Sequence, residues 1–239
     1  MLVLRQGQER FTALIFIGVS PERQRYVLDL NIKDTEEKFQ DKPGMIAVAF
    51  HASLDGEQVA EMIQWESAEH LQAALKAAEI DEHIGDVRQA TTGDEFLPCT
   101  PRYVYTARQA ADATPAVSPV ADAFTVIVRL ETDPGQQQAL LDTLIKDVEA
   151  LRETPQGLLS VSLLATQDGK NVVEYWQFEN QAAYAALRPE FERSALTKKV
   201  SSLIRASEVR LYETGPIMLG VGYKTETQGE VANVRTAGI

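Results

Sequence analysis

The sequence of 239 residues has little of several things that define common classes of protein. It contains one cysteine, Cys99, which excludes an intrachain disulfide and a thiolate-rich metal site. Its 23 lysines and arginines face 35 aspartates and glutamates, a net charge of −12 that argues against nucleic acid and anionic membrane surfaces as partners. The apolar stretch Phe11–Val19 has the length of a strand and is too short to span a membrane. We therefore expect a globular protein in the cytoplasm.

What the chain does contain is the same segment twice, at an offset of 113 residues. When Phe11–Glu66 is placed on Phe124–Glu179 without a gap, about 19 of the 56 pairs are identical. A repeat of this length is a domain rather than a solenoid unit. The expected organisation is a first domain over residues 1–108, a linker over 109–123, a second domain over 124–215 and a tail over 216–239.

Each copy shows the same order of strand and helix signals. A strand precedes a proline at a helix start, two strands flank an Asp-Gly turn, and a second helical region precedes a last strand. The predicted strands are Phe11–Val19, Met45–Ala52, Val59–Trp65 and Arg102–Ala107, then Phe124–Leu130, Leu158–Ala165, Val172–Phe178 and Val209–Glu213. The predicted helices are Pro21–Phe39, Ser67–Ala78 and Ile80–Ala90, then Pro134–Arg152, Gln181–Leu187 and Pro189–Ala206.

This β-α-β-β-α-β order defines a ferredoxin-like unit, in which both helices cover one face of the sheet. The other face of the sheet also needs a cover, because its apolar side chains must be buried. A second copy of the same sheet is the obvious cover. The order of elements therefore predicts an α+β protein in which two ferredoxin-like βαββαβ domains dock sheet to sheet within one chain.

The hairpin of the first copy carries a resemblance to a known family. The segment His51–Ala74, with its Asp-Gly turn, its Trp65 and a Ser-x-Glu helix start, resembles the antibiotic biosynthesis monooxygenase family. The second copy resembles the same signature more weakly between Asp168 and Tyr184. The resemblance implies a dimeric α/β barrel of two ferredoxin-like units, here in tandem and formed within one chain.

The resemblance also implies a site. In the quinone-forming members an Asn and a Trp of the motif line a pocket between sheet and helices; Glu61 stands at the Asn position and Trp65 at the Trp position. His51 stands where aromatic-polyketide members have a histidine. In the second copy Phe178 replaces the Trp and Leu164 replaces the His, so we expect the better site in the first copy.

The residues themselves suggest what this site does. Strand alternation places Glu61, Ile63 and Trp65 on one face. A carboxylate among large apolar side chains is poorly solvated, so its pKa should rise toward neutrality, as a general base for a phenol or an activated C–H requires. We predict Glu61 and His51 as catalytic residues. The predicted substrate-binding residues are Trp65, Ile63, Glu174, Trp176, Phe178 and Tyr184.

The resemblance implies an oxygenase that tailors aromatic polyketides by oxidising a polycyclic phenol or anthrone-like substrate. The deprotonated substrate gives an electron to O2, the co-substrate, so no metal or other cofactor is required. Two alternatives stay open: a ring-opening oxygenase of the angucycline type that uses reduced flavin, and a non-catalytic protein that binds a small aromatic ligand or stabilises a partner. In the non-catalytic case Glu61 and Glu174 are salt-bridge anchors. The sequence is compatible with a monomer and with a homodimer.

Overall fold

The structure of the chain is a computed structural model that describes residues 2–7, 9–76, 91–106, 116–117, 120–151, 156–193 and 195–223. The predicted helix Ile80–Ala90, most of the linker over 109–123 and the end of the tail lie outside the described residues. The chain divides into two units, which we call the first half and the second half. The first half comprises Met1–Leu2, Glu9–Phe96 and Gly215–Ile239, and the second half comprises Val3–Gln8 and Leu97–Thr214.

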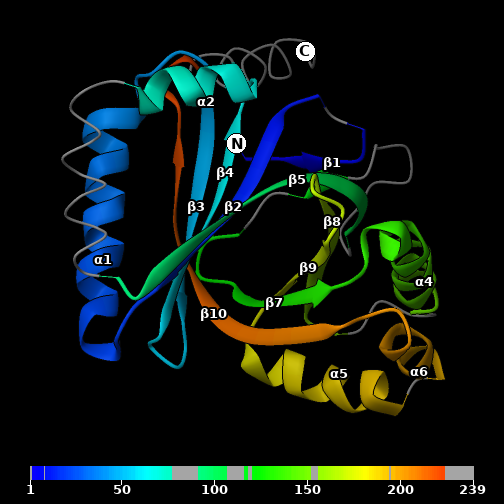
Figure 1. The fold of residues 1–239 in the computed structure, drawn as a ribbon. Helices are drawn as coiled ribbons and strands as arrows, with labels where there is room; N and C mark the ends of the chain where they lie inside the picture. Colours follow the sequence, from blue (N-terminus) through cyan, green and yellow to red (C-terminus); the bar gives the residue numbers. More distant parts are fainter. Residues whose placement is uncertain are drawn as a thin grey trace, which may run out of the picture. The chain divides into compact units, whose positions relative to one another are not determined.

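The first half has the predicted β-α-β-β-α-β order (Figure 1). The strands β2 and β3 both pair with β4 in antiparallel register. Both helices pack on one face of this sheet, where Val27 and Leu28 of α1 and Leu71 of α2 join the apolar strand residues in one core. The elements are β2 (Phe11–Gly18), α1 (Pro21–Asp34), the π-helical turn η1 (Thr35–Phe39), β3 (Met45–Ser53), β4 (Gln58–Trp65), α2 (Ala68–Leu75) and the first residues of β5 (Gly93–Thr106).

The second half repeats this arrangement. The strand β9 pairs with both β7 and β8, and Figure 1 shows α4, α5 and α6 gathered beside these strands. The predicted break before Pro189 is wrong, because α5 continues through this proline; Leu187, two residues earlier, is buried in the core and holds this part of the helix against the sheet. The elements are β7 (Phe124–Glu131), η2 (Pro134–Gln136), α4 (Gln137–Glu149), β8 (Leu158–Thr166), β9 (Asn171–Phe178), α5 (Gln181–Arg193), α6 (Ala195–Ser201) and β10 (Ala206–Leu219), with a small sheet of β1 (Leu4–Arg5) and β6 (Ala116–Val117).

The final strand of each copy is much longer than the sequence predicts. Both β5 and β10 have 14 residues, because each pairs with two neighbours in succession. The strand β10 pairs with β7 over Ala206–Glu213 and then lies next to β3, while β5 lies next to β2 and then pairs with β8 over Cys99–Thr106. Gly215 and Pro216 resemble a strand end in the sequence, yet β10 passes through them to Leu219.

These two long strands close the hydrogen-bonded order β10-β3-β4-β2-β5-β8-β9-β7 into one barrel. The predicted fold class is confirmed: the chain is an α+β protein with two ferredoxin-like units in tandem that share a closed barrel. Within each unit the helices lie on one face of the strands, so a space between sheet and helices exists twice.

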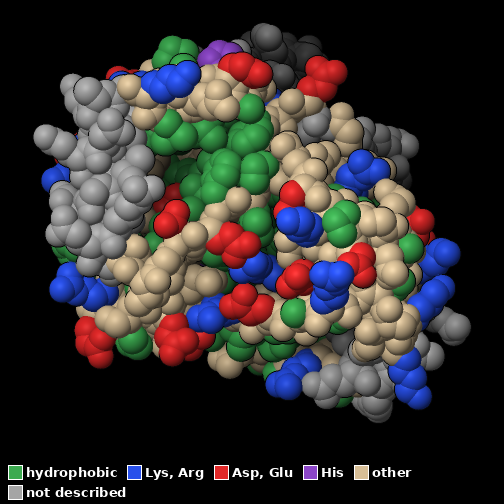
Figure 2. Space-filling model, in the orientation of Figure 1, with side chains coloured by type: hydrophobic (Ala, Val, Ile, Leu, Met, Phe, Trp, Pro, Cys, Tyr) green, Lys and Arg blue, Asp and Glu red, His purple; other side chains and the backbone are tan. Residues whose placement is uncertain are grey.

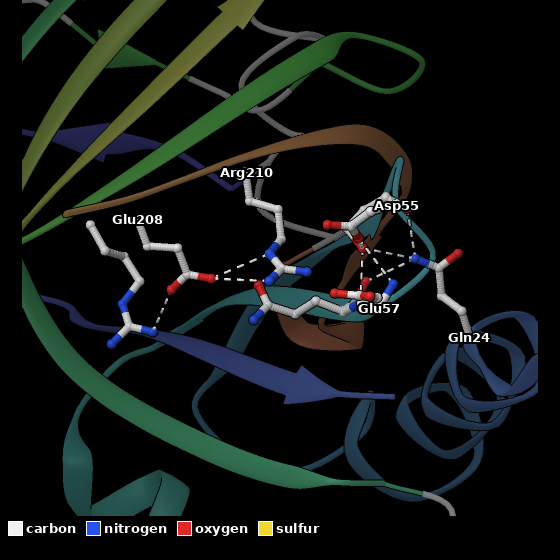
Figure 3. A network of polar contacts seen from close by, with 8 residues as sticks. Gln24, Asp55, Glu57, Glu208 and Arg210 are labelled. Atoms are coloured by element: carbon white, nitrogen blue, oxygen red, sulfur yellow. Dashed lines mark hydrogen bonds and ion pairs between the residues drawn. The ribbon is translucent and has the colours of Figure 1, made fainter. Parts of the chain in front are cut away.

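The two hairpin turns repeat each other down to single hydrogen bonds. In the first half Asp55 Oδ1 accepts from Ser53 Oγ at 2.6 Å and from the backbone N–H of Glu57 at 3.0 Å. Gln24 of α1 donates to the carbonyl of Ser53 at 2.8 Å and so ties the helix to the hairpin (Figure 3). The second half has the same bonds through Gln137, Thr166 and Asp168. The two halves therefore share the same scaffold, and they differ in the side chains that line the space between sheet and helices.

Candidate functional site

In each half the predicted acidic residue lies on the face of the sheet that meets the helices. Glu61 of β4 stands opposite Ile15 and Phe50, and Phe50 belongs to the helix-covered core. Glu174 of β9 lies at the equivalent position, with Trp176 on the same face. The alternation predicted for both strands places these side chains as expected.

A cavity of about 380 Å³ opens between the sheet and the helices of the second half. It is largely apolar, and one wall is aromatic. The rings of Trp176 and Phe178 stack with centroids 6.4 Å apart, and Tyr184 of α5 meets Phe178 edge-on at 5.6 Å. The lining consists of Val126, Val128, Leu144, Asp147, Val148, Glu174, Trp176, Phe178, Tyr184, Arg188, Val200 and Val209. A planar aromatic molecule is the kind of ligand that such a cavity fits.

The carboxyl group of Glu174 is oriented by a hydrogen bond from the aromatic wall. Its Oε2 accepts a hydrogen bond from Trp176 Nε1 at 2.8 Å. Burial raises the pKa of Glu174 to about 7; the indole hydrogen bond opposes this rise, and the negative charge of Asp147 adds to it. Near neutral pH this carboxyl group is therefore divided between its acid and its base form, as proton transfer to and from a substrate requires.

Asp147 of α4 is a second carboxyl group in the same cavity, and we did not predict it as a site residue. Burial raises its pKa to about 6, while the positive charge of Lys199 lowers it. The sequence did hold a signal, because Ile-Lys-Asp recurs at residues 32–34 and 145–147. An aspartate preserved in both copies on the helix facing the predicted base is a candidate for the same site.

The first half has the equivalent cavity, of about 260 Å³, lined by Glu61 and Ile63 among others. Burial raises the pKa of Glu61 to about 7 here too. The aromatic rings of the second half have no counterpart at two positions, because Ile63 stands where the second half has Trp176, and Leu71 stands where it has Tyr184; Phe39 of η1 and Phe96 of β5 line this cavity instead. Figure 2 shows hydrophobic side chains gathered in a hollow next to α2.

The structure does not bring the predicted catalytic residues Glu61 and His51 together. His51 pairs with Ala60, the neighbour of Glu61 on β4, so its side chain lies on the opposite face of the sheet. There it is fully buried with Nδ1 3.2 Å from the carbonyl oxygen of Ala60, and burial lowers its pKa to about 4. Trp65 shares the face of Glu61, but it is buried in the core and does not line the first-half cavity. In contrast, Glu174, Trp176, Phe178 and Tyr184 meet in one cavity.

The fold and the two cavities define a tandem ferredoxin-like protein with a carboxyl group between sheet and helices in each unit. The family model described as antibiotic biosynthesis monooxygenase matches residues 123–189, which is the copy with the weaker signature. Over 91 residues the chain is 31% identical to tetracenomycin-F1 monooxygenase of Streptomyces glaucescens, covering 38% of this chain and 81% of that protein. The chain therefore belongs to the antibiotic biosynthesis monooxygenase family.

Solved structures support the fold over both halves. An anthrone oxidase-like protein superposes with a TM-score of 0.80 at 19% identity, over 93% of this chain and 98% of the other. A proposed monooxygenase from Lactobacillus acidophilus superposes with a TM-score of 0.58 at 9% identity, over 89% of this chain and 97% of the other. At these identities the likeness concerns the fold alone. Among the described residues, no helix combines the length and the apolar character that crossing a membrane requires.

Proposed function

We propose that this chain is a monooxygenase that oxidises a polycyclic phenol or anthrone-like substrate with O2 in the cavity of the second half. The observation that carries the proposal is an aromatic-walled cavity of about 380 Å³ that holds a carboxyl group titrating near neutral pH. The family supports the reaction class, and the name of the tetracenomycin relative supports an aromatic polyketide as substrate.

In this proposal Glu174 is the base. The Trp176 indole fixes one of its carboxylate oxygens, so the orientation of the carboxyl group is set before the substrate enters. Glu174 removes a proton from the substrate, and the electron-rich anion that results gives one electron to O2. The apolar walls exclude water and protect the radical pair until it recombines. This route uses no metal or flavin.

The comparison with the first half shifts the proposed site away from the residues first predicted. Glu61 and Ile63 line a smaller cavity that lacks the stacked Trp176 and Phe178 rings and the Tyr184 ring, and His51 lies on the other side of the sheet. We therefore assign catalysis to Glu174, and substrate contact to Trp176, Phe178 and Tyr184. Within the described residues neither Glu61 nor Glu174 forms an ion pair, which counts against a role as salt-bridge anchors.

The test is oxygen uptake by the full chain with an anthrone, after treatment with a chelator and without added flavin. We expect O2 consumption together with formation of the quinone chromophore. Uptake that appears only when reduced flavin is supplied would make the flavin alternative correct. If neither condition gives uptake while the anthrone binds, as followed by quenching of tryptophan fluorescence, the non-catalytic alternative holds and the proposal is wrong.

A further inference from the structure

Two carboxyl groups from different elements line the cavity of the second half. Glu174 lies on β9 and Asp147 on α4, and both are half-buried. Among the described residues, Asp147 Oδ1 has no hydrogen-bond partner although it is buried. A buried carboxylate oxygen without a donor is costly, so a reason for its presence is required.

The first half shows how the same aspartate is held when it is neutralised locally. Lys38 Nζ lies 3.1 Å from Asp34 Oδ1, one helical turn away. The residue at the equivalent position of the second half is Leu151. The second half therefore keeps the aspartate and replaces the lysine that follows it with an apolar side chain.

The charged and titratable groups that face this pair come from three further positions. Arg188 and Tyr184 of α5 line the cavity, and Lys199 of α6 lies close enough to lower the pKa of Asp147. The like charge of Asp147 in turn raises the pKa of Glu174. Two carboxylates in one apolar cavity resist simultaneous ionisation, so the pair retains a proton into the neutral range.

We propose that Asp147 and Glu174 form a carboxyl pair in one cavity that holds one proton between its two members, and that Asp147 is the second proton-transfer group of the reaction. This inference rests on the proposed function. It adds a residue from α4 to a site that otherwise belongs to β9 and α5, and it assigns that residue a separate chemical step.

The oxidation of a CH2 group to a carbonyl needs both an acid and a base. First, the ionised carboxylate takes one C–H proton, the carbanion gives one electron to O2, and the two radicals join through a C–O bond. The peroxide anion then takes a proton from the pair. Next, the pair takes the remaining C–H proton while the O–O bond breaks, and the departing hydroxide takes a proton from the pair to become water. The sum is CH2 plus O2 giving C=O plus H2O, and the pair ends with one proton, as it began.

The test compares Asp147→Asn with Asp142→Asn, since Asp142 is an exposed aspartate on the same helix that accepts from Gln138 at 2.8 Å. The amide cannot serve as acid or base in the second step. We expect quinone formation by Asp147→Asn to fall about 10²-fold, the scale of lost acid–base catalysis. Oxygen uptake should fall less, so the quinone formed per O2 consumed drops and hydroperoxide is released.

The pH profile is the second readout, because it reports whether the charge of Asp147 acts on Glu174, which the exposed Asp142 should not do. Removing the negative charge of Asp147 lowers the pKa of Glu174, and the rising limb of O2 uptake should move to lower pH. If Asp147→Asn matches Asp142→Asn in both product ratio and pH profile, the inference is wrong and the proposed function stands. If the wild-type chain consumes no O2, the proposed function is wrong.

A measurement without substrate covers the case in which Asp147→Asn does not fold. The infrared titration is done on the Glu61→Gln variant, which lacks the other carboxyl group whose pKa is about 7. If the pair holds one proton, one protonated carboxyl band persists to neutral pH in this variant. The band should disappear in the double variant Glu61→Gln, Glu174→Gln. Loss of all protonated carboxyl bands below about pH 5, the ordinary range for such groups, would overturn the shared proton.

Discussion

The two halves carry the same carboxyl groups on the same scaffold and differ in what surrounds them. Glu61 and Glu174 are equivalent, and burial raises the pKa of each to about 7. The walls differ, because Trp176 and Phe178 stack in the cavity of the second half, whereas Phe39 and Phe96 line the cavity of the first half. A perturbed pKa therefore does not by itself identify the reacting half. The stacked aromatic wall, the larger volume and the match of the family model are the reasons for proposing the second half.

The largest effect we predict comes from removing the two equivalent carboxyl groups, Glu174 and Glu61, one at a time. Glu174→Gln should lower quinone formation by about 10²-fold or more, because the base is lost while the shape is kept. Glu61→Gln should stay within about twofold of wild type, because its cavity does not bind the substrate in this proposal. Initial rates of quinone absorbance measure both variants. The reverse order of effects would move the active site to the first half.

The same Glu61→Gln variant predicts a change in stability whose size depends on pH. Folding raises the pKa of Glu61 from 4.5 to about 7, so between these values the unfolded state ionises while the folded state keeps its proton, and stability falls as pH rises. At pH 8 the amide should raise the free energy of unfolding by about 2 kcal/mol, somewhat less than a shift of this size would give in full. At about pH 3.5 the difference should nearly vanish, because the carboxyl group is then protonated in both the folded and the unfolded state. Urea unfolding at both pH values measures this, and a loss of stability at pH 8 would indicate a structural anchor.

Two substitutions of Trp176 separate the effect of the aromatic wall from the effect of the hydrogen bond to Glu174. The first replaces it with isoleucine, the residue of the first half. Trp176→Ile should reduce the rate at neutral pH about tenfold, and its rising limb should move to higher pH, because the indole N–H lowers the pKa of Glu174. Trp176→Phe keeps an aromatic wall without the donor. It should show the same pH shift with a smaller rise in KM. Identical pH profiles for wild type and both variants would contradict the role of this hydrogen bond.

The fold was readable from the sequence because its signals are local and occur twice. Helix starts and Asp-Gly turns gave the order of elements, whereas β5 and β10 were predicted too short, β10 because Gly215 and Pro216 resemble a strand end. The side of the sheet on which His51 lies could have been predicted from the sequence. The hairpin register pairs His51 with Ala60 and Phe50 with Glu61, so His51 and Glu61 occupy opposite faces.

The sequence alone could not predict that the second half has the larger cavity. The volume of a cavity depends on side chains from separate elements, such as Tyr184 of α5, Val200 of α6 and Val209 of β10. Strand alternation determines the face on which a residue lies, but it does not determine how closely a helix approaches that face. Trp65 shows the difference, because it shares the face of Glu61 and is nevertheless buried in the core.

The smallest effect we predict concerns Tyr184, which Leu71 replaces in the first half. The Tyr184 ring lines the cavity and is held by Phe178 at 5.6 Å and Phe124 at 5.7 Å, and a substrate ring packed on it would gain about 1 kcal/mol from the aromatic contact. Tyr184→Leu should therefore raise KM about fivefold and leave kcat nearly unchanged, because the ring contacts the substrate equally before and during the reaction. Tyr184→Phe is the matched control and should behave as wild type. If Tyr184→Phe lowers kcat instead, the hydroxyl group takes part in proton transfer, and the carboxyl pair is not the complete set of acids and bases in this cavity.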